Sequence, residues 1–365
     1  MIPLYCGGGA LRIAQVAPLY ESVPPRLYGG TERVVYYLTE ELVRRGHQVT
    51  LFASGDSRTS ARLEAACPAA LRLDPSCDDP LPHHVLLLER VAARAHGFDV
   101  VHFHTEYLHF PLARRLGVPT VTTLHGRLDL SDYAGLFREF GDLALVSVSE
   151  AQRRPLPWVN WVATVHHGLP AEAYRPGDGR GGYLAFLGRM SPEKRPDLAI
   201  RIARRAGIPL KMAAKVDRAD REYFEAVVRP LLREPQVEFL GEIRQEEKGR
   251  FLGDALALLF PIDWPEPFGL VMVEALACGT PVVAFRRGSV PEVLEDGVTG
   301  FVVDDPQGAV AAVERVARLD RRRCRQAFEE RFTAERMAQD YLEVYRRLQV
   351  GYRLPPPEPV VRSAA

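Results

Sequence analysis

The chain is 365 residues long, which exceeds the usual size of a single hydrophobic core, so two domains are expected. Apolar residues make up 47% and charged residues 26% of the chain, the composition of an ordinary globular protein. Basic and acidic residues number 47 each, so the formal net charge is zero and no overall positive field would attract nucleic acid.

The cysteines and the apolar segments predict a cytoplasmic protein. The five cysteines are scattered, odd in number and without metal-ligand spacing, which indicates reduced thiols, although Cys67 and Cys77 could pair in a loop. Residues 1–10 lack a basic segment followed by an apolar one, so no signal peptide is expected. No apolar run approaches the ~18 residues of a membrane span, and no strongly basic amphipathic helix favours membrane contact.

The first half of the chain alternates strands with helices, the pattern of a parallel sheet covered by helices. Short apolar runs predict strands at residues 11–16, 48–53, 99–104, 119–124, 144–148 and 161–166. Helices are expected at residues 31–45, 85–96 and 112–116, the first of them capped by Thr31. Residues 54–82 and 126–140 are expected to be loops, the first with at most one short element.

A glycine pair, Gly29 and Gly30, precedes the first predicted helix. Two glycines at a helix start allow a ligand to approach the backbone closely, although a plain turn would also use them. The loop before them is long and contains prolines, and it has no G-x-G-x-x-G sequence. The dinucleotide fingerprint is therefore missing, which disfavours a redox enzyme of the Rossmann type.

Polar side chains recur where the predicted strands of this half end. They are His104, His125, Ser149 and His167, and ligands of open parallel sheets lie beyond these carboxyl ends. His102 lies inside an apolar strand and is expected to be a hydrogen-bonded structural residue. His125 is followed directly by a glycine and is expected to face the crevice, so it is the candidate functional histidine.

The alternation starts again after residues 169–182, a segment rich in proline and glycine that predicts an interdomain linker. Strands are expected at residues 183–187, 210–215, 237–240, 255–260, 281–285 and 301–303. Helices are expected at residues 192–206, capped by Ser191, and at 219–233, 244–252, 270–278, 291–295, 306–319 and 333–348. Two such series imply two Rossmann-like domains that face each other across a cleft.

Residues 263–281 pass from a proline-rich turn into a helix and carry two glutamates, Glu266 and Glu274, eight residues apart. A helix start preceded by glycine presents free backbone N–H groups and a positive dipole end, which together bind phosphate. Glu274 lies about one turn into the helix and could accept hydrogen bonds from a pair of sugar hydroxyls. The segment therefore predicts a site for a phosphate flanked by hydroxyl-rich groups, as in a nucleotide sugar.

The second half resembles the retaining glycosyltransferases of family 4, which have the GT-B fold. The resemblance lies in PEPFGLVMVEALACGTP at residues 265–281, FLGRMSPEKR at 186–195, and GSVPEVL at 288–294 followed by GVTGF at 297–301. The first half matches more loosely, through YGGTE at residues 28–32, DVVHFH at 99–104 and HG at 125–126. The GGTER form at residues 29–33 is similar to that of a subgroup that includes avilamycin-type transferases. The chain departs from the family pattern at His167, where asparagine is common.

The resemblance implies roles for twelve residues. Arg189 and Lys194 would hold the donor diphosphate, Glu266 would face the transferred sugar, and His125 would lie beside that sugar, which makes these four the catalytic candidates. The implied donor-binding residues are Gly29, Gly30, Lys215, Glu242, Phe268, Gly269, Leu270 and Glu274, the last of them binding the ribose. No metal or other cofactor is expected, because the family needs none and no D-x-D sequence stands out.

The expected activity is that of a retaining glycosyltransferase that moves a hexose from a UDP- or GDP-sugar to an acceptor. A sugar phosphorylase or a sucrose- or trehalose-type enzyme on the same fold is the alternative, and a non-catalytic nucleotide-sugar-binding protein is the second. The expected units are an acceptor-side domain at residues 1–170, a donor-binding domain at 171–332, a helix at 333–350 that packs back on the first domain, and a disordered tail at 351–365.

Overall fold

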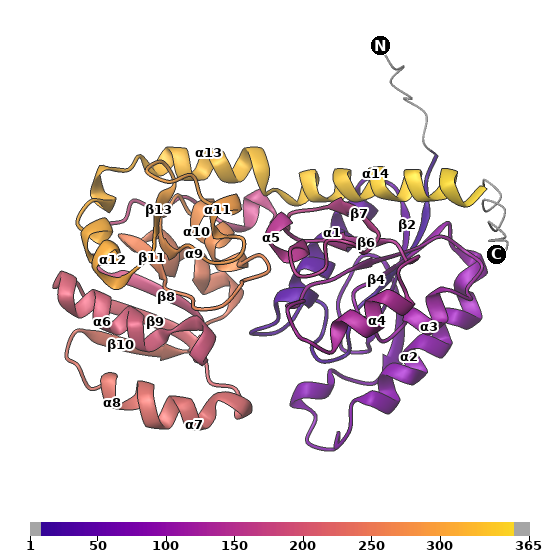
Figure 1. Cartoon of the computed structure of the whole chain (residues 1–365), viewed down its shortest axis with the longest axis horizontal. Helices are drawn as coiled ribbons and strands as arrows, with labels where there is room; N and C mark the ends of the chain where they lie inside the picture. Colours follow the sequence, from indigo (N-terminus) through magenta and orange to yellow (C-terminus); the bar gives the residue numbers. More distant parts are fainter. Residues whose placement is uncertain (1–8, 354–365) are drawn as a thin grey trace, which may run out of the picture.

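The computed structural model describes residues 9–353 and has two lobes, seen side by side in Figure 1. The N-terminal lobe contains a seven-stranded sheet in the order β3-β2-β1-β4-β5-β6-β7, in which every pairing is parallel. Its strands are β1 (Arg12–Val16), β2 (Gln48–Ser54), β3 (Arg62–Cys67), β4 (Val100–Phe103), β5 (Thr120–Thr123), β6 (Leu145–Ser147) and β7 (Trp161–Thr164).

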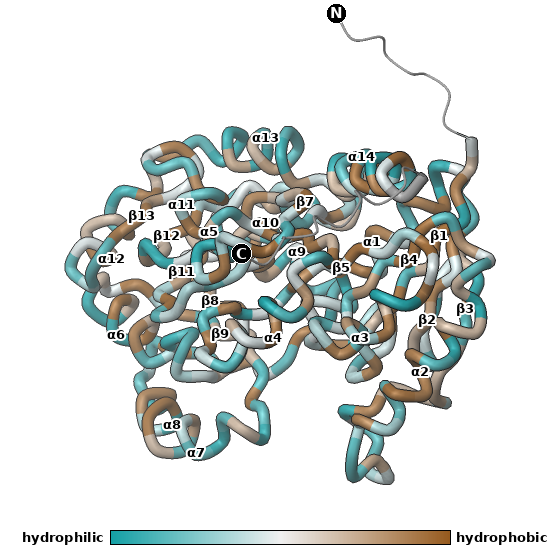
Figure 2. The backbone as a smooth tube through the Cα atoms, turned by 45° about the vertical axis from the view of Figure 1, so that its right-hand side comes forward, coloured by the Kyte–Doolittle hydropathy of each residue, from teal (hydrophilic) through white to brown (hydrophobic). Residues whose placement is uncertain are grey.

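The C-terminal lobe contains a six-stranded parallel sheet in the order β10-β9-β8-β11-β12-β13. Its strands are β8 (Leu184–Arg189), β9 (Leu210–Lys215), β10 (Val237–Gly241), β11 (Ala257–Phe260), β12 (Val282–Phe285) and β13 (Gly300–Val303). Apolar strands lie inside each lobe in the hydropathy view of Figure 2. Strands β4, β11 and β12 are buried along their whole length, as expected for a parallel sheet with both faces covered.

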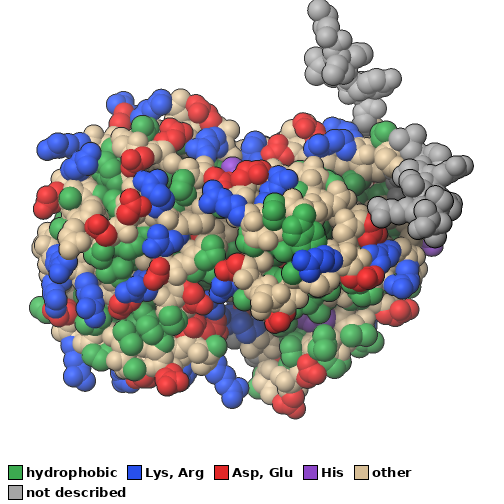
Figure 3. All heavy atoms as spheres, in the orientation of Figure 1, with side chains coloured by type: hydrophobic (Ala, Val, Ile, Leu, Met, Phe, Trp, Pro, Cys, Tyr) green, Lys and Arg blue, Asp and Glu red, His purple; other side chains and the backbone are tan. Residues whose placement is uncertain are grey.

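Helices cover both sheets. Those of the N-terminal lobe are α1 (Gly30–Arg44), α2 (Leu81–Arg94), α3 (Phe110–Ala113), α4 (Tyr133–Glu139) and α5 (Glu150–Arg153). Those of the C-terminal lobe are α6 (Pro196–Ala206), α7 (Arg221–Tyr223), α8 (Arg229–Leu231), α9 (Gln245–Gly253), α10 (Leu270–Ala277), α11 (Val290–Val293), α12 (Pro306–Val313) and α13 (Arg321–Arg331). Basic and acidic side chains are interspersed on the face shown in Figure 3.

The final helix, α14 (Ala334–Arg353), leaves the C-terminal lobe and lies along the N-terminal lobe, where it packs beside α1 (Figure 1). Its inner face contains Met337, Tyr341 and Tyr345, each at most 1% exposed. This crossing, together with the two parallel sheets, confirms the GT-B architecture expected from the resemblance. The tail expected at residues 351–365 falls mostly outside the described residues, as does Cys6.

Each sheet has a switch point that defines where a ligand can bind. Strand order reverses between β1 and β4 in the first sheet and between β8 and β11 in the second. Crevices in open α/β sheets form beyond the carboxyl ends of strands at such points. His104 follows β4 and Arg189 ends β8, so each switch point contributes a polar side chain where the two lobes meet.

Several predicted elements of the N-terminal lobe were wrong in detail. Residues 54–82 contain the strand β3 and a 3-10 turn, and residues 126–140 contain the helix α4. Thr31 does not cap α1, because the helix begins one residue earlier with Gly29 at the N-cap position and no side-chain cap. A glycine pair lets the backbone turn into the helix without a capping side chain.

In the C-terminal lobe, the helix predicted from residue 192 begins at residue 196. Ser191 precedes only a 3-10 turn, Pro192–Lys194, and Arg195 then adopts a left-handed conformation with a φ of 52°. The helix predicted at residues 219–233 is divided into the short helices α7 and α8 around a π-helical segment, and the one predicted at 306–319 ends at 313. Helix α13 was not predicted at all, because Arg321–Arg331 is strongly polar.

The described cysteines Cys67, Cys77, Cys278 and Cys324 are free thiols, so the alternative pairing of Cys67 with Cys77 is not formed. Between residues 9 and 353, no helix is both long and apolar enough to cross a membrane. A cytoplasmic location stays a prediction.

Candidate active site

A cavity of ≈ 280 Å³ lies between the lobes and is lined by residues from both of them. It brings together all twelve residues that the resemblance singled out: Gly29, Gly30, His125, Arg189, Lys194, Lys215, Glu242, Glu266, Phe268, Gly269, Leu270 and Glu274. These residues come from six stretches of the chain, at 29–30, 125, 189–194, 215, 242 and 266–274, so the fold itself assembles them.

The C-terminal lobe contributes two cations side by side at one wall of the cavity. Arg189 ends β8 and Lys215 ends β9, and the parallel register pairs these two residues. The Arg189 guanidinium lies 3.5 Å from Asp220 Oδ2, and the Lys215 ammonium lies 2.8 Å from Asp217 Oδ2. Because Arg189 remains 31% exposed, it can leave its weak ion pair and bind an anion in the cavity.

A third cation, Lys194, forms an ion pair with Glu266 Oε2 in the same wall. The Trp264 indole N–H donates to the same oxygen over 2.8 Å, and the Lys194 ammonium lies 5.0 Å from the Trp264 ring centroid. Both members of the pair are nearly buried, with side-chain exposures of 13% and 9%. The indole and the lysine fix the Glu266 carboxylate, and a cation–π contact favours the lysine position.

Helix α10 begins at the cavity and contributes two of the predicted site residues, Gly269 and Glu274. Gly269 is its N-cap residue, with a φ of 79° that side chains rarely adopt, and it leaves the backbone N–H groups of the first turn unshielded. Glu274, one turn further, accepts hydrogen bonds from Tyr174 Oη and Lys248 Nζ on the same oxygen, Oε1, each over 2.8 Å. Burial lowers the Lys248 pKa, and the Glu274 carboxylate opposes that shift.

The N-terminal lobe closes the cavity with the glycine pair. A Cβ atom on Gly29 would lie 2.7 Å from Pro25 Cβ, so a side chain has no room there. Gly30 faces the start of α10 across the lobes, where an added Cβ would lie 3.6 Å from Leu270. The Tyr28 ring lies 5.5 Å from the Lys215 ammonium and also lines the cavity.

His125 lines the cavity from the end of the first sheet. Its Nε2 lies 2.9 Å from His104 Nδ1, whereas its Nδ1 is buried and has no hydrogen-bond partner among the described residues. Burial lowers the pKa of His125 to about 3, so the ring is neutral near pH 7. The His167 ring stacks on it at a centroid distance of 5.2 Å, and His167 Nδ1 is also buried without a partner.

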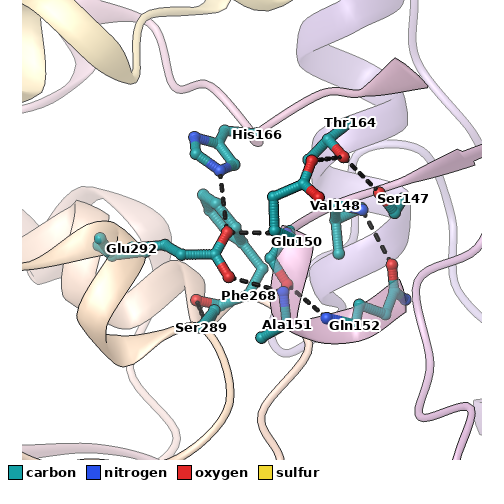
Figure 4. A network of polar contacts seen from close by, with 12 residues as sticks. Ser147, Val148, Glu150, Ala151, Gln152, Thr164, His166, Phe268, Ser289 and Glu292 are labelled. Atoms are coloured by element: carbon teal, nitrogen blue, oxygen red, sulfur yellow. Dashed lines mark hydrogen bonds and ion pairs between the residues drawn. The ribbon is translucent and has the colours of Figure 1, made fainter. Parts of the chain in front are cut away.

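A group of polar contacts centred on Glu292, called the clasp below, joins the two lobes (Figure 4). Glu292, at the start of α11, accepts hydrogen bonds from the backbone N–H groups of Glu150 and Ala151 over 2.8 and 2.6 Å, and its Oε2 lies 3.5 Å from His166 Nε2. A carboxylate at a helix start satisfies N–H groups that have no partner within the helix. Burial alone would raise the Glu292 pKa, but these hydrogen bonds outweigh it and lower the pKa.

The short helix α5 connects the clasp to His125. Gln152 in α5 donates from its amide nitrogen to the carbonyl oxygens of Leu124 and Gly126, over 2.9 and 2.8 Å. These two residues flank His125 in the chain. One side chain therefore connects the helix held by the clasp to the backbone on either side of the candidate histidine.

The sequence did not assign functions to several residues of this cavity. Tyr28 and Trp264 lie next to predicted site residues, and an aromatic ring beside such a residue is the signal that would have drawn attention to them. Lys248 was placed in a helix without a role, and its contact with Glu274 joins positions 26 residues apart. In residues 9–353 no group of three or more histidine, cysteine or acidic side chains could hold a metal ion.

Comparison with known proteins matches both lobes to glycosyltransferase models. The model described as "Glycosyl transferases group 1" matches residues 177–331, and the model described as "Glycosyltransferase Family 4" matches residues 28–164. A D-inositol 3-phosphate glycosyltransferase of Frankia alni is 30% identical over 63% of this chain and 68% of its own length. A glycogen synthase of Mycobacterium tuberculosis is 28% identical over 97% of this chain and 99% of its own length.

Solved structures agree with these relatives. AviGT4, a glycosyltransferase involved in avilamycin A biosynthesis, superposes with a TM-score of 0.71 and 25% identity over 93% of this chain and 98% of its own. A sucrose-phosphate synthase of Thermosynechococcus elongatus has the same fold, with a TM-score of 0.77 at 20% identity over 93% of this chain and 100% of its own. The fold and these matches define an enzyme of the glycosyltransferase class. The chain belongs to glycosyltransferase family 4.

Proposed function

We propose that this glycosyltransferase moves a hexose from a UDP- or GDP-sugar to an acceptor hydroxyl with retention of anomeric configuration. The observation that carries the proposal is the convergence of Arg189, Lys194 and Lys215 with the start of α10 in one cavity between the lobes. Three cations and a free helix N-terminus form a site for a group with several negative charges, which a diphosphate supplies. The whole-length relatives, a glycogen synthase among them, support a sugar-transferring role for this site.

The diphosphate would bind between Arg189 and Lys194, with the backbone N–H groups of residues 268–270, at the start of α10, on its other side. As the bond from the anomeric carbon to the diphosphate oxygen breaks, negative charge grows on that oxygen. Fixed cations stabilise this charge more strongly in the transition state than in the bound donor, which is what lowers the barrier.

The two glutamates would hold the two ends of the donor. Glu274, fixed through Oε1 by Tyr174 and Lys248, would accept hydrogen bonds from the ribose hydroxyl pair with its other oxygen. Glu266, fixed by Lys194 and the Trp264 indole, would lie next to the transferred sugar opposite His125. Each carboxylate is held in place by an ion pair with a lysine, Glu266 with Lys194 and Glu274 with Lys248.

Transfer with retention requires attack on the face that the leaving group departs from. The acceptor oxygen forms the new bond to the anomeric carbon while the diphosphate oxygen takes the electron pair of the breaking bond. The same phosphate oxygen then accepts the acceptor's hydroxyl proton, so the products are the glycosylated acceptor and the nucleoside diphosphate. Lys194 and Arg189 act by positioning and charge, and no protein group needs to form a covalent bond.

A donor panel tests the proposal. Incubation with UDP-, GDP- and ADP-sugars should raise the melting temperature for the true donor and give slow hydrolysis of it. A donor that raises the melting temperature but is not consumed with any acceptor would indicate the nucleotide-sugar-binding alternative. Turnover that occurs only with inorganic phosphate or a free sugar would indicate the phosphorylase or the sucrose- or trehalose-type alternative. If no donor changes the melting temperature or is consumed, the transferase proposal fails.

Replacing Lys194 tests the assigned chemistry directly. Lys194→Ala should reduce turnover by about 10²–10³-fold, the usual cost of removing a group that stabilises transition-state charge. Lys211→Ala is the matched control, because Lys211 lies 36% exposed in a surface pair with Glu238 and outside the cavity lining. Near-normal turnover of Lys194→Ala would remove this lysine from the diphosphate site.

A further inference from the structure

Tyr28 is the aromatic side chain that the N-terminal lobe places beside the cations of the other lobe. It directly precedes the glycine pair and lines the cavity together with it. Its ring lies 5.5 Å from the ammonium of Lys215, which ends β9 in the C-terminal lobe. This cation–π contact holds the ring of one lobe against a cation of the other.

The hydroxyl of Tyr28 lies among the charged groups of the site. The charges of Lys194, Glu266, Arg189 and Glu274 all act on it. Arg189 ends β8 and Lys194 ends the turn that follows, whereas the two glutamates lie before and within α10. A single hydroxyl is near all four only if it lies between these two segments, so it is inside the site.

The ring of Tyr28 is open to the cavity and not to the outside of the molecule. The residue is 39% exposed, yet burial raises the pKa of its hydroxyl above the usual value near 10. Both hold because the exposed surface is a wall of the cavity, which the two lobes enclose. The raised pKa keeps the phenol protonated at neutral pH, so its O–H group can donate a hydrogen bond.

The Tyr28 hydroxyl has no hydrogen-bond partner among residues 9–353. Hydrogen bonds are made by the hydroxyls of the tyrosines Tyr174, Tyr183, Tyr223, Tyr341 and Tyr345. Polar groups enclosed by protein are normally paired, so an unpaired one at a cavity wall is available to a ligand. Beside three cations, that ligand is an anion.

The backbone on both sides of Tyr28 is fixed. Arg33 in α1 donates from Nη2 to the carbonyl oxygen of Leu27 over 2.8 Å. Gly29 packs so closely that an added Cβ atom would lie 2.7 Å from Pro25 Cβ. The phenol is therefore positioned before a ligand binds, and little ordering entropy opposes the contact.

A neutral hydrogen-bond donor complements the cations at this position. Each of the three cations lies next to a carboxylate, in the pairs Arg189 with Asp220, Lys215 with Asp217 and Lys194 with Glu266. These carboxylates reduce the positive charge that the cavity wall presents to an anion. The Tyr28 hydroxyl has no counter-ion, and hydrogen bonds to charged groups are stronger than those between neutral groups.

We propose that the Tyr28 hydroxyl donates a hydrogen bond to a phosphate oxygen of the donor, so that both lobes bind the diphosphate. Resting on the transferase function proposed above, this contact adds Tyr28 to the donor-binding residues. The hydrogen bond strengthens as negative charge grows on the departing diphosphate, so it acts in the transition state as well as in the bound donor. The diphosphate site is complete only when the two lobes are together.

Calorimetric titration of the full-length protein with inorganic pyrophosphate tests this contact without a sugar donor. Tyr28→Phe keeps the ring on Lys215 and removes only the hydroxyl. It should weaken pyrophosphate binding by about 10–100-fold, the worth of one hydrogen bond to a charged group. The melting temperature without ligand should stay that of the wild type, because the hydroxyl has no partner in the free protein.

Tyr20→Phe is the matched control, because Tyr20 lies in the same loop, is 45% exposed and is not among the cavity-lining residues. It should bind pyrophosphate as the wild type does. Equal affinities of Tyr28→Phe and wild type, an equal loss in both variants, or no binding of pyrophosphate by the wild type would overturn the proposal.

The donor identified by the panel, together with its nucleoside diphosphate, shows which group the hydroxyl contacts. Tyr28→Phe should weaken both ligands by a similar factor and lower kcat/KM by at least that factor. Normal binding of the nucleoside diphosphate with weakened binding of the nucleotide sugar would place the hydroxyl on the transferred sugar and overturn the proposal. Pyrophosphate binding that depends on Tyr28, with no donor consumed, would refute the transferase function and support the phosphate contact.

Discussion

The clasp at Glu292 gives a prediction whose size follows from its geometry. In Glu292→Gln the side chain keeps its shape but has one oxygen instead of two. In the wild-type protein, each oxygen of the Glu292 carboxylate accepts one hydrogen bond from a backbone N–H, that of Glu150 or of Ala151. In the variant, either orientation of the amide therefore leaves one of these N–H groups facing an NH₂ group. Losing one charge-assisted hydrogen bond costs about 1.5–3 kcal/mol, and Glu292 is only 19% exposed, so solvent recovers little of it.

The assay is thermal unfolding followed by calorimetry at pH 7. A loss of ~2 kcal/mol corresponds to a decrease of about 4–8 °C in the melting temperature of domains of this size. Glu295→Gln is the control, because Glu295 is 47% exposed in a surface pair with Arg331 and should change stability by less than ~0.5 kcal/mol. Equal melting temperatures for Glu292→Gln and Glu295→Gln would refute the assigned clasp.

The same carboxylate has a predictable pH dependence. Its pKa is lowered in the folded protein, so its contribution is complete above the unfolded-state pKa of about 4.3 and is lost as pH falls through the lower folded value. The difference in stability between wild type and Glu292→Gln should therefore shrink below about pH 4. A difference that is constant down to pH 3 would show that the charge of Glu292 is not what stabilises the clasp.

Three further predictions concern the cavity wall and its supports. Gly269→Ala should destabilise the protein by about 1–2 kcal/mol in chemical denaturation, because the φ of 79° at this position disfavours any side chain. The same change should weaken donor binding. An unchanged donor affinity would count against the start of α10 as a phosphate site. Lys248→Met should lower the free energy of unfolding by about 3–5 kcal/mol, because it leaves Glu274 buried without its cation. The double variant Lys248→Met/Glu274→Leu should recover much of that stability. If the double variant recovers none of it, the pairing is refuted. Glu106 Oε1 accepts hydrogen bonds from the backbone N–H groups of His125 and Gly126, and burial raises the Glu106 pKa to about 7. Its contribution to stability is therefore present below about pH 4.5 and lost as pH rises through 7. Glu106→Gln should match wild type at about pH 4.5 and be more stable at about pH 8, and equal stability of the two proteins at both pH values would contradict that shift.

Local sequence predicted the elements that carry the site more reliably than the contacts between them. Proline, glycine and helix-forming residues mark the turn and helix at residues 265–277, and the structure has α10 there with Gly269 as its N-cap. The ion pair of Lys194 with Glu266 joins positions 72 residues apart, and no local pattern encodes such a distance. Hydrogen bonds also lead from His125 through His104 and Gln15 to Tyr345. They connect the first sheet to the last helix, and these two elements meet because α14 crosses back to the N-terminal lobe.

The missed elements share one physical cause, which is limited burial. Strand β3 lies at the sheet edge and has only its last two residues buried, so its sequence lacks the apolar run of the inner strands. Helix α13 buries only Cys324, Ala327 and Phe328. Those three positions have the spacing of one helix face, a signal that the many arginines around them obscured.

The crossing of α14 makes the N-terminal lobe a discontinuous folding unit, and this limits how the enzyme can be divided or recombined. A fragment that stops at the interlobe linker would lack Tyr345 and leave Gln15 and His102 without the hydroxyl they share. It would also expose the apolar faces of α1 that α14 covers. Exchange of N-terminal lobes between related transferases therefore requires the transfer of two segments, the first half of the chain and its final helix, so that the C-terminal lobe is joined at both of its ends.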